Sequence, residues 1–347
     1  MKVKNTVFIL QALLAALFFG ASAPLSKLLL ADVPPVLMAA FLYLGSGTGI
    51  ALVKLFQRMA SYQTEAGIKR PDVKWLAGAI VSGGVLAPIV LMISLQNTAA
   101  STASLLLNFE GVGTTLIALF FFRESVSRRA LAAIFVITLA GIFLSTNFAG
   151  GFGLSLGALG VILACVLWGV DNNFTRNISA KDPLTIVAWK GLVAGTFSLF
   201  LGLFLGQRLP ALATILSILL LGFISYGFST MLFIYSMRGL GAARTSALYG
   251  TAPLAGVLLS FMIFRDPITL LFLFAAVLMA AGALLLANEE HAHFHIHMPV
   301  VHEHRHRHDE FHEHDTVDVA HSHEHEHLHT EHEHGHMPDI HHRHEDK

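Results

Sequence analysis

Long uninterrupted apolar stretches constrain the fold of this chain more than any other feature. A helix that crosses a bilayer needs about 20 mostly apolar residues, and the sequence has ten such stretches separated by short segments with proline and charge. They cover residues 6–26, 35–56, 73–94, 98–122, 129–147, 155–175, 184–205, 211–237, 242–264 and 268–287. Because the apolar runs are continuous rather than alternating, helices are favoured over barrel strands. The sequence therefore predicts an all-α integral membrane protein with ten transmembrane helices.

Charge divides the chain into two parts. Residues 1–287 carry 18 basic and 8 acidic side chains, a net charge of +10, whereas residues 288–347 carry 4 and 15, a net charge of −11. All 21 histidines lie in the second part. Only 13% of all residues are charged and 54% are apolar, which is unlike an average soluble domain. We expect a membrane-embedded body followed by a polar, acidic tail.

Basic residues also predict the orientation of the body, because loops rich in Lys and Arg stay in the cytoplasm. With the N-terminus inside, 14 basic residues fall on the cytoplasmic face and three, Lys27, Arg208 and Arg265, on the other. Ten spans then place both termini in the cytoplasm. We expect a multi-pass protein of a bacterial cytoplasmic (inner) membrane. The first span resembles a cleavable signal peptide, but the repeat described next requires this helix to stay.

The body repeats itself in two registers. A first pattern recurs 149 residues later, where Phe19-Gly20, Lys27 and Pro34 become Trp168-Gly169, Arg176 and Pro183. A second recurs 142 residues later, where Ala100, Ser104, Leu106 and Phe122-Arg123-Glu124 become Ala242, Ser246, Leu248 and Phe264-Arg265-Asp266. Five helices per copy is an odd number, so the second copy lies upside down in the membrane, an arrangement typical of transporters. We expect a first repeat over residues 1–147, a second over 148–288 and a tail over 289–347.

These motifs resemble the EamA-like branch of the drug/metabolite transporter superfamily. Each repeat opens with an aromatic-Gly pair that leads to a basic residue, and the fourth helix of the second repeat has a small-residue start, Pro253 and an acidic end. The first repeat differs, because Gly111 stands where the proline is expected. The resemblance covers about residues 5–287 and implies transport, usually export, of a small organic metabolite. The substrate remains open between amino-acid-like and drug-like molecules.

Ionisable residues at bilayer depth are costly and usually face the protein interior. Three stand out: Glu110 in the fourth span, Asp171 in the sixth and Lys190 in the seventh. Asp171 and Lys190 are either a structural ion pair or part of a gate or substrate anchor. Glu110 is either a coupling group that takes up and releases a proton or a carboxyl satisfied by local partners. In the resembling family the fourth helix lines the substrate cavity.

Other polar and aromatic residues of the spans are candidates to orient a substrate, with core packing as the alternative for each. They are Asn108, Trp168, Asn172, Tyr249 and Thr251. We predict no enzyme, because the body has no histidine to serve as a general base. The glycine-rich segment at residues 45–49 lies within a span, where close helix packing explains it better than a nucleotide site.

The tail repeats His-x-His with acidic residues between, a composition that predicts disorder. Imidazole and carboxylate ligands suit Zn²⁺, Ni²⁺ or Co²⁺, so we expect the tail to bind divalent metal although no cofactor is required. The candidate ligands are His291, His293, His295, His297, His302, His304, His306, His308, His323, His325, His327, His329, His332, His334 and His336.

Three functions remain open from the sequence. The first is an exporter of a small organic metabolite whose tail responds to metal or pH, since histidine titrates between pH 5 and 8. The second is a divalent-metal transporter, and the third is a membrane-anchored metal sensor. The spans hold no histidine and one cysteine, which favours the first. The partners expected are the substrate, the lipid bilayer and divalent metal, with no nucleic acid and an open oligomeric state.

Overall fold

The computed structural model describes most of the body and four segments of the tail. The described residues are 2–59, 66–122, 128–147, 153–178, 181–240, 245, 248–266, 268–287, 291–297, 300–306, 321–327 and 330–336. Of the candidate metal ligands, His308 and His329 lie outside them, as do the repeat positions Arg123, Glu124, Ala242 and Ser246.

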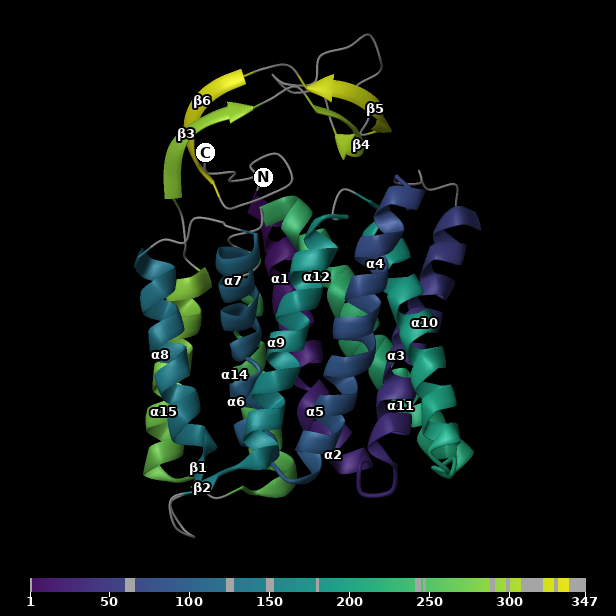
Figure 1. Ribbon diagram of the computed structural model, residues 1–347, viewed down its shortest axis with the longest axis vertical. Helices are drawn as coiled ribbons and strands as arrows, with labels where there is room; N and C mark the ends of the chain where they lie inside the picture. Colours follow the sequence, from purple (N-terminus) through teal and green to yellow (C-terminus); the bar gives the residue numbers. More distant parts are fainter. Residues whose placement is uncertain are drawn as a thin grey trace.

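The body is a bundle of helices that run side by side along the long axis (Figure 1). In chain order these are α1 (Lys2–Gly20), α2 (Ser22–Leu29), α3 (Pro35–Met59), α4 (Val73–Ala79), α5 (Ala87–Gln96), α6 (Ala100–Leu106), α7 (Phe109–Phe121), α8 (Arg128–Ser145), α9 (Leu156–Arg176), α10 (Pro183–Phe204), α11 (Leu212–Gly222), α12 (Ser229–Leu240), α14 (Ala252–Phe264) and α15 (Leu270–Ala287). A 3-10 turn, η1 (Arg70–Asp72), precedes α4, and two π-helical segments, η2 (Ile80–Leu86) and η3 (Phe223–Phe228), join α4 to α5 and α11 to α12. Between α8 and α9 the short strands β1 (Thr146–Asn147) and β2 (Gly153–Leu154) pair antiparallel.

Seven helical segments in the described residues are long and apolar enough to cross a membrane. Three further expected spans correspond to shorter apolar helices, at Leu131–Leu144, Ala252–Phe264 and Leu270–Leu285. The multi-pass helical body is therefore confirmed, and the count of ten spans stays a prediction. Large apolar side chains such as Phe204 are almost fully exposed on the outside of the bundle. An apolar surface of this extent is favourable where it faces lipid rather than water.

Four helices that the sequence predicts as continuous are irregular. The first is divided at Ala21 into α1 and α2, and the fourth is divided at Leu107 and Asn108 into α6 and α7. The third and eighth contain the π segments η2 and η3. The second repeat register relates the two halves by 142 residues. Adding 142 to the residue numbers of η2 gives 222–228, which is the position of η3. The two halves thus share a helix irregularity as well as sequence motifs.

Small residues allow the helices to approach closely, as predicted for the glycine-rich segment of α3. A side chain added at Gly45 would collide with the backbone of α11 at Leu219, and one added at Gly47 would collide with α10 at Leu192. α3 and α10 pack along their length at one side of the bundle, while α8 and α15 pair at the other (Figure 1). Close packing through small residues is thereby confirmed at this segment.

The glycines of the two aromatic-Gly motifs have equivalent roles. Gly20 of α1 lies against the backbone of Ala252 in α14, and Gly169 of α9 lies against the backbone of Gly113 in α7. Each motif glycine therefore contacts the C-terminal part of the fourth helix of the other half. No side chain larger than hydrogen fits between these backbones, which explains why the motif needs glycine.

Charged side chains tie the ends of the bundle together. Lys54 of α3 donates to Asp182 Oδ2 at 2.5 Å, and the backbone N–H of Asp182 donates to the Ala66 carbonyl at 2.9 Å. Burial alone would raise the pKa of Asp182, but hydrogen bonds from Lys54, Thr185 and the Leu184 N–H outweigh it and hold that pKa below its usual value. The Asp182 carboxyl therefore stays ionised at neutral pH, and its contact with Lys54 joins α3 to the start of α10.

At the opposite end of the bundle, Lys27 of α2 donates to the carbonyls of Leu95 and Thr98 at 2.7 and 2.5 Å. These carbonyls belong to the C-terminal end of α5 and the turn after it, where a cation is favoured. Beside it, Asp266 accepts bonds from the N–H and the hydroxyl of Ser101 at the start of α6. Lys27, the basic residue of the first motif, thus binds carbonyl groups at the C-terminal end of α5.

Within the tail the structure describes four strands: β3 (His291–His297), β4 (Val300–His306), β5 (His321–His327) and β6 (Thr330–His336). β3 pairs antiparallel with β6, and β4 with β5. The two-residue period of His-x-His matches the period of a strand. The strands lie beyond the end of the bundle at which α1 starts (Figure 1).

We predict that Gly169→Ala lowers the stability of the body by about 1–3 kcal/mol, because the added methyl overlaps the α7 backbone and forces the helices apart. Gly67→Ala is the matched control, since a methyl there meets nothing within 4 Å. Thermal unfolding in detergent measures both. Equal midpoints for the two variants would contradict the close approach of α7 and α9.

Candidate substrate and coupling site

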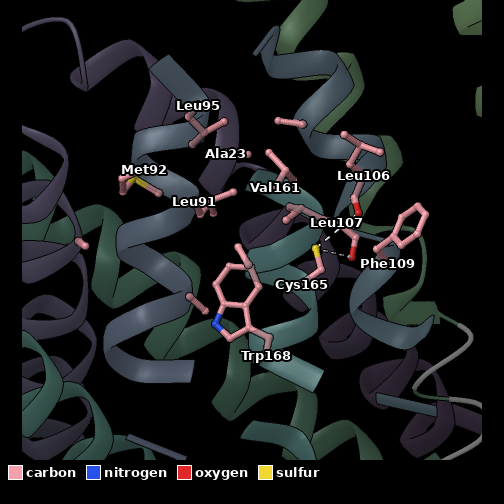
Figure 2. Close-up of a cluster of buried hydrophobic side chains, with 14 of the residues drawn as sticks. Ala23, Leu91, Met92, Leu95, Leu106, Leu107, Phe109, Val161, Cys165 and Trp168 are labelled. Carbon is pink, nitrogen blue, oxygen red and sulfur yellow. Dashed lines mark hydrogen bonds between the residues drawn. The ribbon is translucent and has the colours of Figure 1, made fainter. Parts of the chain in front are cut away.

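The break between α6 and α7 exposes backbone groups inside the bundle. At the break the backbone makes short-range bonds, from Asn108 N–H to the Leu105 carbonyl and from Glu110 N–H to the Leu107 carbonyl, both at 3.1 Å. Cys165 of α9 donates its thiol to the Leu106 carbonyl at 3.5 Å and lies 3.8 Å from the Leu107 carbonyl oxygen, as Figure 2 shows. The single cysteine of the chain thus supports a helix break.

The π segment η2 is supported from two other helices. Tyr43 of α3 donates its hydroxyl to the Gly83 carbonyl at 2.6 Å, and Trp168 of α9 donates its indole N–H to the same oxygen at 3.0 Å. The indole nitrogen also lies 3.4 Å from the Tyr43 hydroxyl. In Figure 2 the Trp168 ring points away from Cys165 although both side chains belong to α9. Trp168 therefore joins three spans around one carbonyl.

Glu110 lies at the start of α7 and contacts the sixth span. Asn172 of α9 donates its amide N–H to the Glu110 carboxylate at 2.9 Å and lies 3.1 Å from the Thr114 hydroxyl oxygen. The neighbouring Asn173 donates to the Thr114 carbonyl at 3.0 Å. Two adjacent asparagines of α9 thus hold α7, and Glu110 and Asn172 meet as candidates of the same site.

Asp171 and Lys190 form an ion pair between α9 and α10. Asp171 is buried, with 3% of its side chain exposed, and also accepts a bond from the Thr175 hydroxyl at 3.0 Å. Lys190 keeps 20% of its side chain exposed. The carboxylate fills the space next to Gly83, where any larger side chain would collide with it. The two opposite charges neutralise each other within the second half of the chain.

Aromatic rings from both halves gather next to this polar group. Phe19 of α1 contacts Tyr226 of η3 and Tyr249, with ring centroids 6.0 and 5.6 Å apart. Tyr226 also contacts Tyr43, at 5.8 Å, and Tyr249 contacts Phe233 of α12, at 4.8 Å. Tyr43 also donates to the Gly83 carbonyl, and the Asp171 carboxylate lies next to Gly83. A carboxylate and a set of aromatic rings therefore share one region of the bundle.

Two candidates make only local contacts in the described structure. Asn108 donates to the Leu105 carbonyl, and exposed Thr251 donates to the Leu248 carbonyl at 2.7 Å, so both side chains close turns where helices begin. Sequence reasoning missed Phe19, Tyr43 and Tyr226. A signal for Phe19 was present, since it occupies in the first motif the place of Trp168 in the second.

The arrangement defines a class of protein: a helical membrane transporter with a polar and aromatic centre between two halves. The family model described as the EamA-like transporter family matches residues 6–147 and again 155–288. The chain belongs to this family. The resemblance seen in the sequence is thereby confirmed.

Two further comparisons agree with this assignment. A protein of Methanothermobacter thermautotrophicus (strain Delta H), named an uncharacterized transporter, is 28% identical over 288 residues, which cover 78% of this chain and 83% of the relative. A protein of known crystal structure superposes with a TM-score of 0.58 and 20% identity, covering 80% of this chain and 94% of that chain. The second likeness supports the fold alone.

We predict that Tyr43→Phe and Trp168→Phe each reduce stability by about 1 kcal/mol, because each removes one donor to the Gly83 carbonyl and keeps a ring in place. The double variant leaves that buried carbonyl without either donor, so its loss exceeds the sum of the single losses. Unfolding titrations of the four proteins give the coupling energy. Strict additivity would show that the two donors do not share one acceptor.

Proposed function

We propose that the chain is a secondary transporter that exports a small organic metabolite across a bacterial cytoplasmic membrane, with both termini in the cytoplasm. Membership of the EamA-like family supports transport. The observation that carries the site is the hydrogen bond between Glu110 of the first half and Asn172 of the second. Because this contact joins the two halves at bilayer depth, a change at Glu110 alters how the halves pack.

Ten helices in two inverted five-helix repeats are the architecture we propose for this transport. The two family matches support a repeat, and opposite directions of its first helices support inversion. α1 starts at the end of the bundle beyond which the tail strands lie, and α9 starts at the other end, beside β2 (Figure 1). The matching π segments of the third and eighth helices add a structural correspondence. Inverted halves can open in turn to either side around a fixed centre.

Glu110 is the coupling group in this proposal. The other two charges at this depth, Asp171 and Lys190, neutralise each other in an ion pair, whereas the carboxylate of Glu110 is bonded to the neutral amide of Asn172. Burying a carboxylate without a counter-charge is costly. In this proposal Glu110 therefore binds either a proton or a cation, and each of them neutralises the carboxylate. Each exchange links the occupancy of the site to the packing of α7 against α9.

We predict that Glu110→Gln folds normally and loses substrate-driven proton movement. A glutamine oxygen still accepts the Asn172 bond, but the side chain no longer titrates. Candidate metabolites added to inverted vesicles with a pH gradient, read by a pH-sensitive dye, measure the movement. Asp32→Asn in an exposed loop is the matched control. Wild-type proton movement in Glu110→Gln would contradict the coupling role, and failure to insert would indicate a structural role.

The tail is proposed to bind divalent metal and to regulate transport. The register of its strands supports binding, because histidine stands opposite histidine three times in each pair. These pairs are His291 with His336, His293 with His334, His295 with His332, His302 with His325, His304 with His323 and His306 with His321. In each register the opposed histidines recur at every second residue, so potential imidazole ligands are concentrated along each pair of strands.

We predict that the full chain binds several Zn²⁺ ions and that a chain ending at Asn288 loses this binding while its organic transport persists. Binding weakens as the pH falls through about 6.5, because protonated imidazole is no ligand. Equilibrium dialysis with metal analysis measures binding, and flux in vesicles measures transport. If truncation instead abolishes a metal flux that the full chain performs, the protein is a metal transporter. If metal and pH leave the flux of the full chain unchanged, the tail has no regulatory role.

A further inference from the structure

We propose that the aromatic and carboxylate group around Glu110 is a binding site for an organic cation: an amine or quaternary ammonium compound with an apolar body. The group consists of Glu110, Phe19, Tyr226 and Tyr249, with Tyr43 behind it. This inference rests on the proposed transport function and names its substrate class. It is carried by the balance of charge, the placement of the rings and the exposure of the side chains.

Among the charged groups described around the site, the carboxylate of Glu110 has no counter-charge and is available to a ligand. Asp171 is the sequence neighbour of Asn172, which binds Glu110, and Lys190 of α10 pairs with Asp171. Lys190 is engaged by Asp171, so it is not available to an anionic substrate. Lys27, elsewhere in the first half, is occupied by two backbone carbonyls. Among the described residues of this region the unmatched charge is therefore negative, which selects a cation.

The rings supply the second requirement for such a ligand. Phe19, Tyr226 and Tyr249 are in contact, with centroids 5.6–6.0 Å apart around Phe19, and they come from different spans of both halves. Faces of aromatic rings attract cations, and several rings around one position bind alkylated ammonium groups. The same rings provide apolar surface for the organic part of the ligand.

Exposure shows which of these side chains a ligand can reach. Glu110, Phe19, Tyr226 and Tyr249 are each partly exposed although they contact residues from several spans. Tyr43 and Trp168 are buried, at 6% each, and are bonded to the Gly83 carbonyl. The first four thus keep part of their surface free of protein contacts, whereas Tyr43 and Trp168 are held in place by the Gly83 carbonyl.

The class of ligand is tested by three probes of nearly equal size and different charge. They are 2-phenylethylammonium, neutral 2-phenylethanol and anionic 3-phenylpropionate, titrated calorimetrically into the purified full chain in neutral detergent. We expect the cation to bind and the other two to bind about tenfold more weakly or worse. Glu110→Gln weakens binding of the cation by about tenfold or more and leaves binding of 2-phenylethanol unchanged, because the substitution removes only the charge.

Ring variants separate stacking from hydrogen bonding. Tyr226→Phe keeps the aromatic face and retains binding of the cation, whereas Tyr226→Leu weakens that binding by about fivefold or more. Phe19→Leu serves the same purpose if Tyr226→Leu does not fold, as judged by its thermal midpoint. Equal cation binding by the leucine and phenylalanine variants would overturn the role of the rings.

Three results would overturn the proposal as a whole. They are tighter binding of 3-phenylpropionate than of the cation, equal cation binding by wild type and Glu110→Gln, and no binding of any probe to folded protein. Flux measured in vesicles distinguishes this failure from failure of the proposed function. Transport of neutral or anionic metabolites without cation binding would overturn the substrate class alone, whereas no flux of any class would overturn transport itself.

Discussion

A bilayer supplies no water to backbone groups, so every carbonyl released by an irregular helix must find a donor within the protein. This requirement organises the centre of the molecule. The Gly83 carbonyl in η2 receives bonds from Tyr43 and Trp168, and the Leu106 carbonyl at the break before α7 receives the thiol of Cys165. In each case the donor comes from a different span. Irregular backbone in one helix is therefore possible only because another helix packs against it.

The same requirement makes the two halves depend on each other. Cys165, Trp168, Asn172 and Asn173 belong to one helix of the second half, and all four contact backbone or side chains of the first half. Gly169 lies among them and allows α9 to approach α7. The sixth span is thus the main connection between the halves around Glu110. A movement of α9 relative to α7 would change every one of these contacts together, which suits a transporter with two alternating arrangements.

Much of the body can be predicted from sequence because apolar length and motif spacing are properties of single segments. The spans, the family and the presence of ionisable residues at depth follow from such local signals. The ion pair of Asp171 and Lys190 was one of two expected roles, since each buried charge requires a partner. The break at Leu107 was not predicted, because no proline marks it. The π segment η2 was also missed, although Pro88 just after it has no N–H to donate to a carbonyl one turn earlier.

The aromatic part of the site was also missed for a physical reason. Phe19, Tyr43 and Tyr226 are far apart in the chain and each resembles ordinary core packing when it is considered alone. Only the packing of α1, α3 and η3 brings their rings together.

The central claim is that the region between Glu110 and Asn172 opens in turn to the two sides of the membrane. Thr114 adjoins this contact, is partly exposed and differs little in size from cysteine. Thr114→Cys in a Cys165→Ser background provides one thiol at the site, which is then treated with a membrane-impermeant maleimide in right-side-out and in inverted vesicles. The account predicts modification from both sides. Modification from one side alone, or from neither, would contradict it.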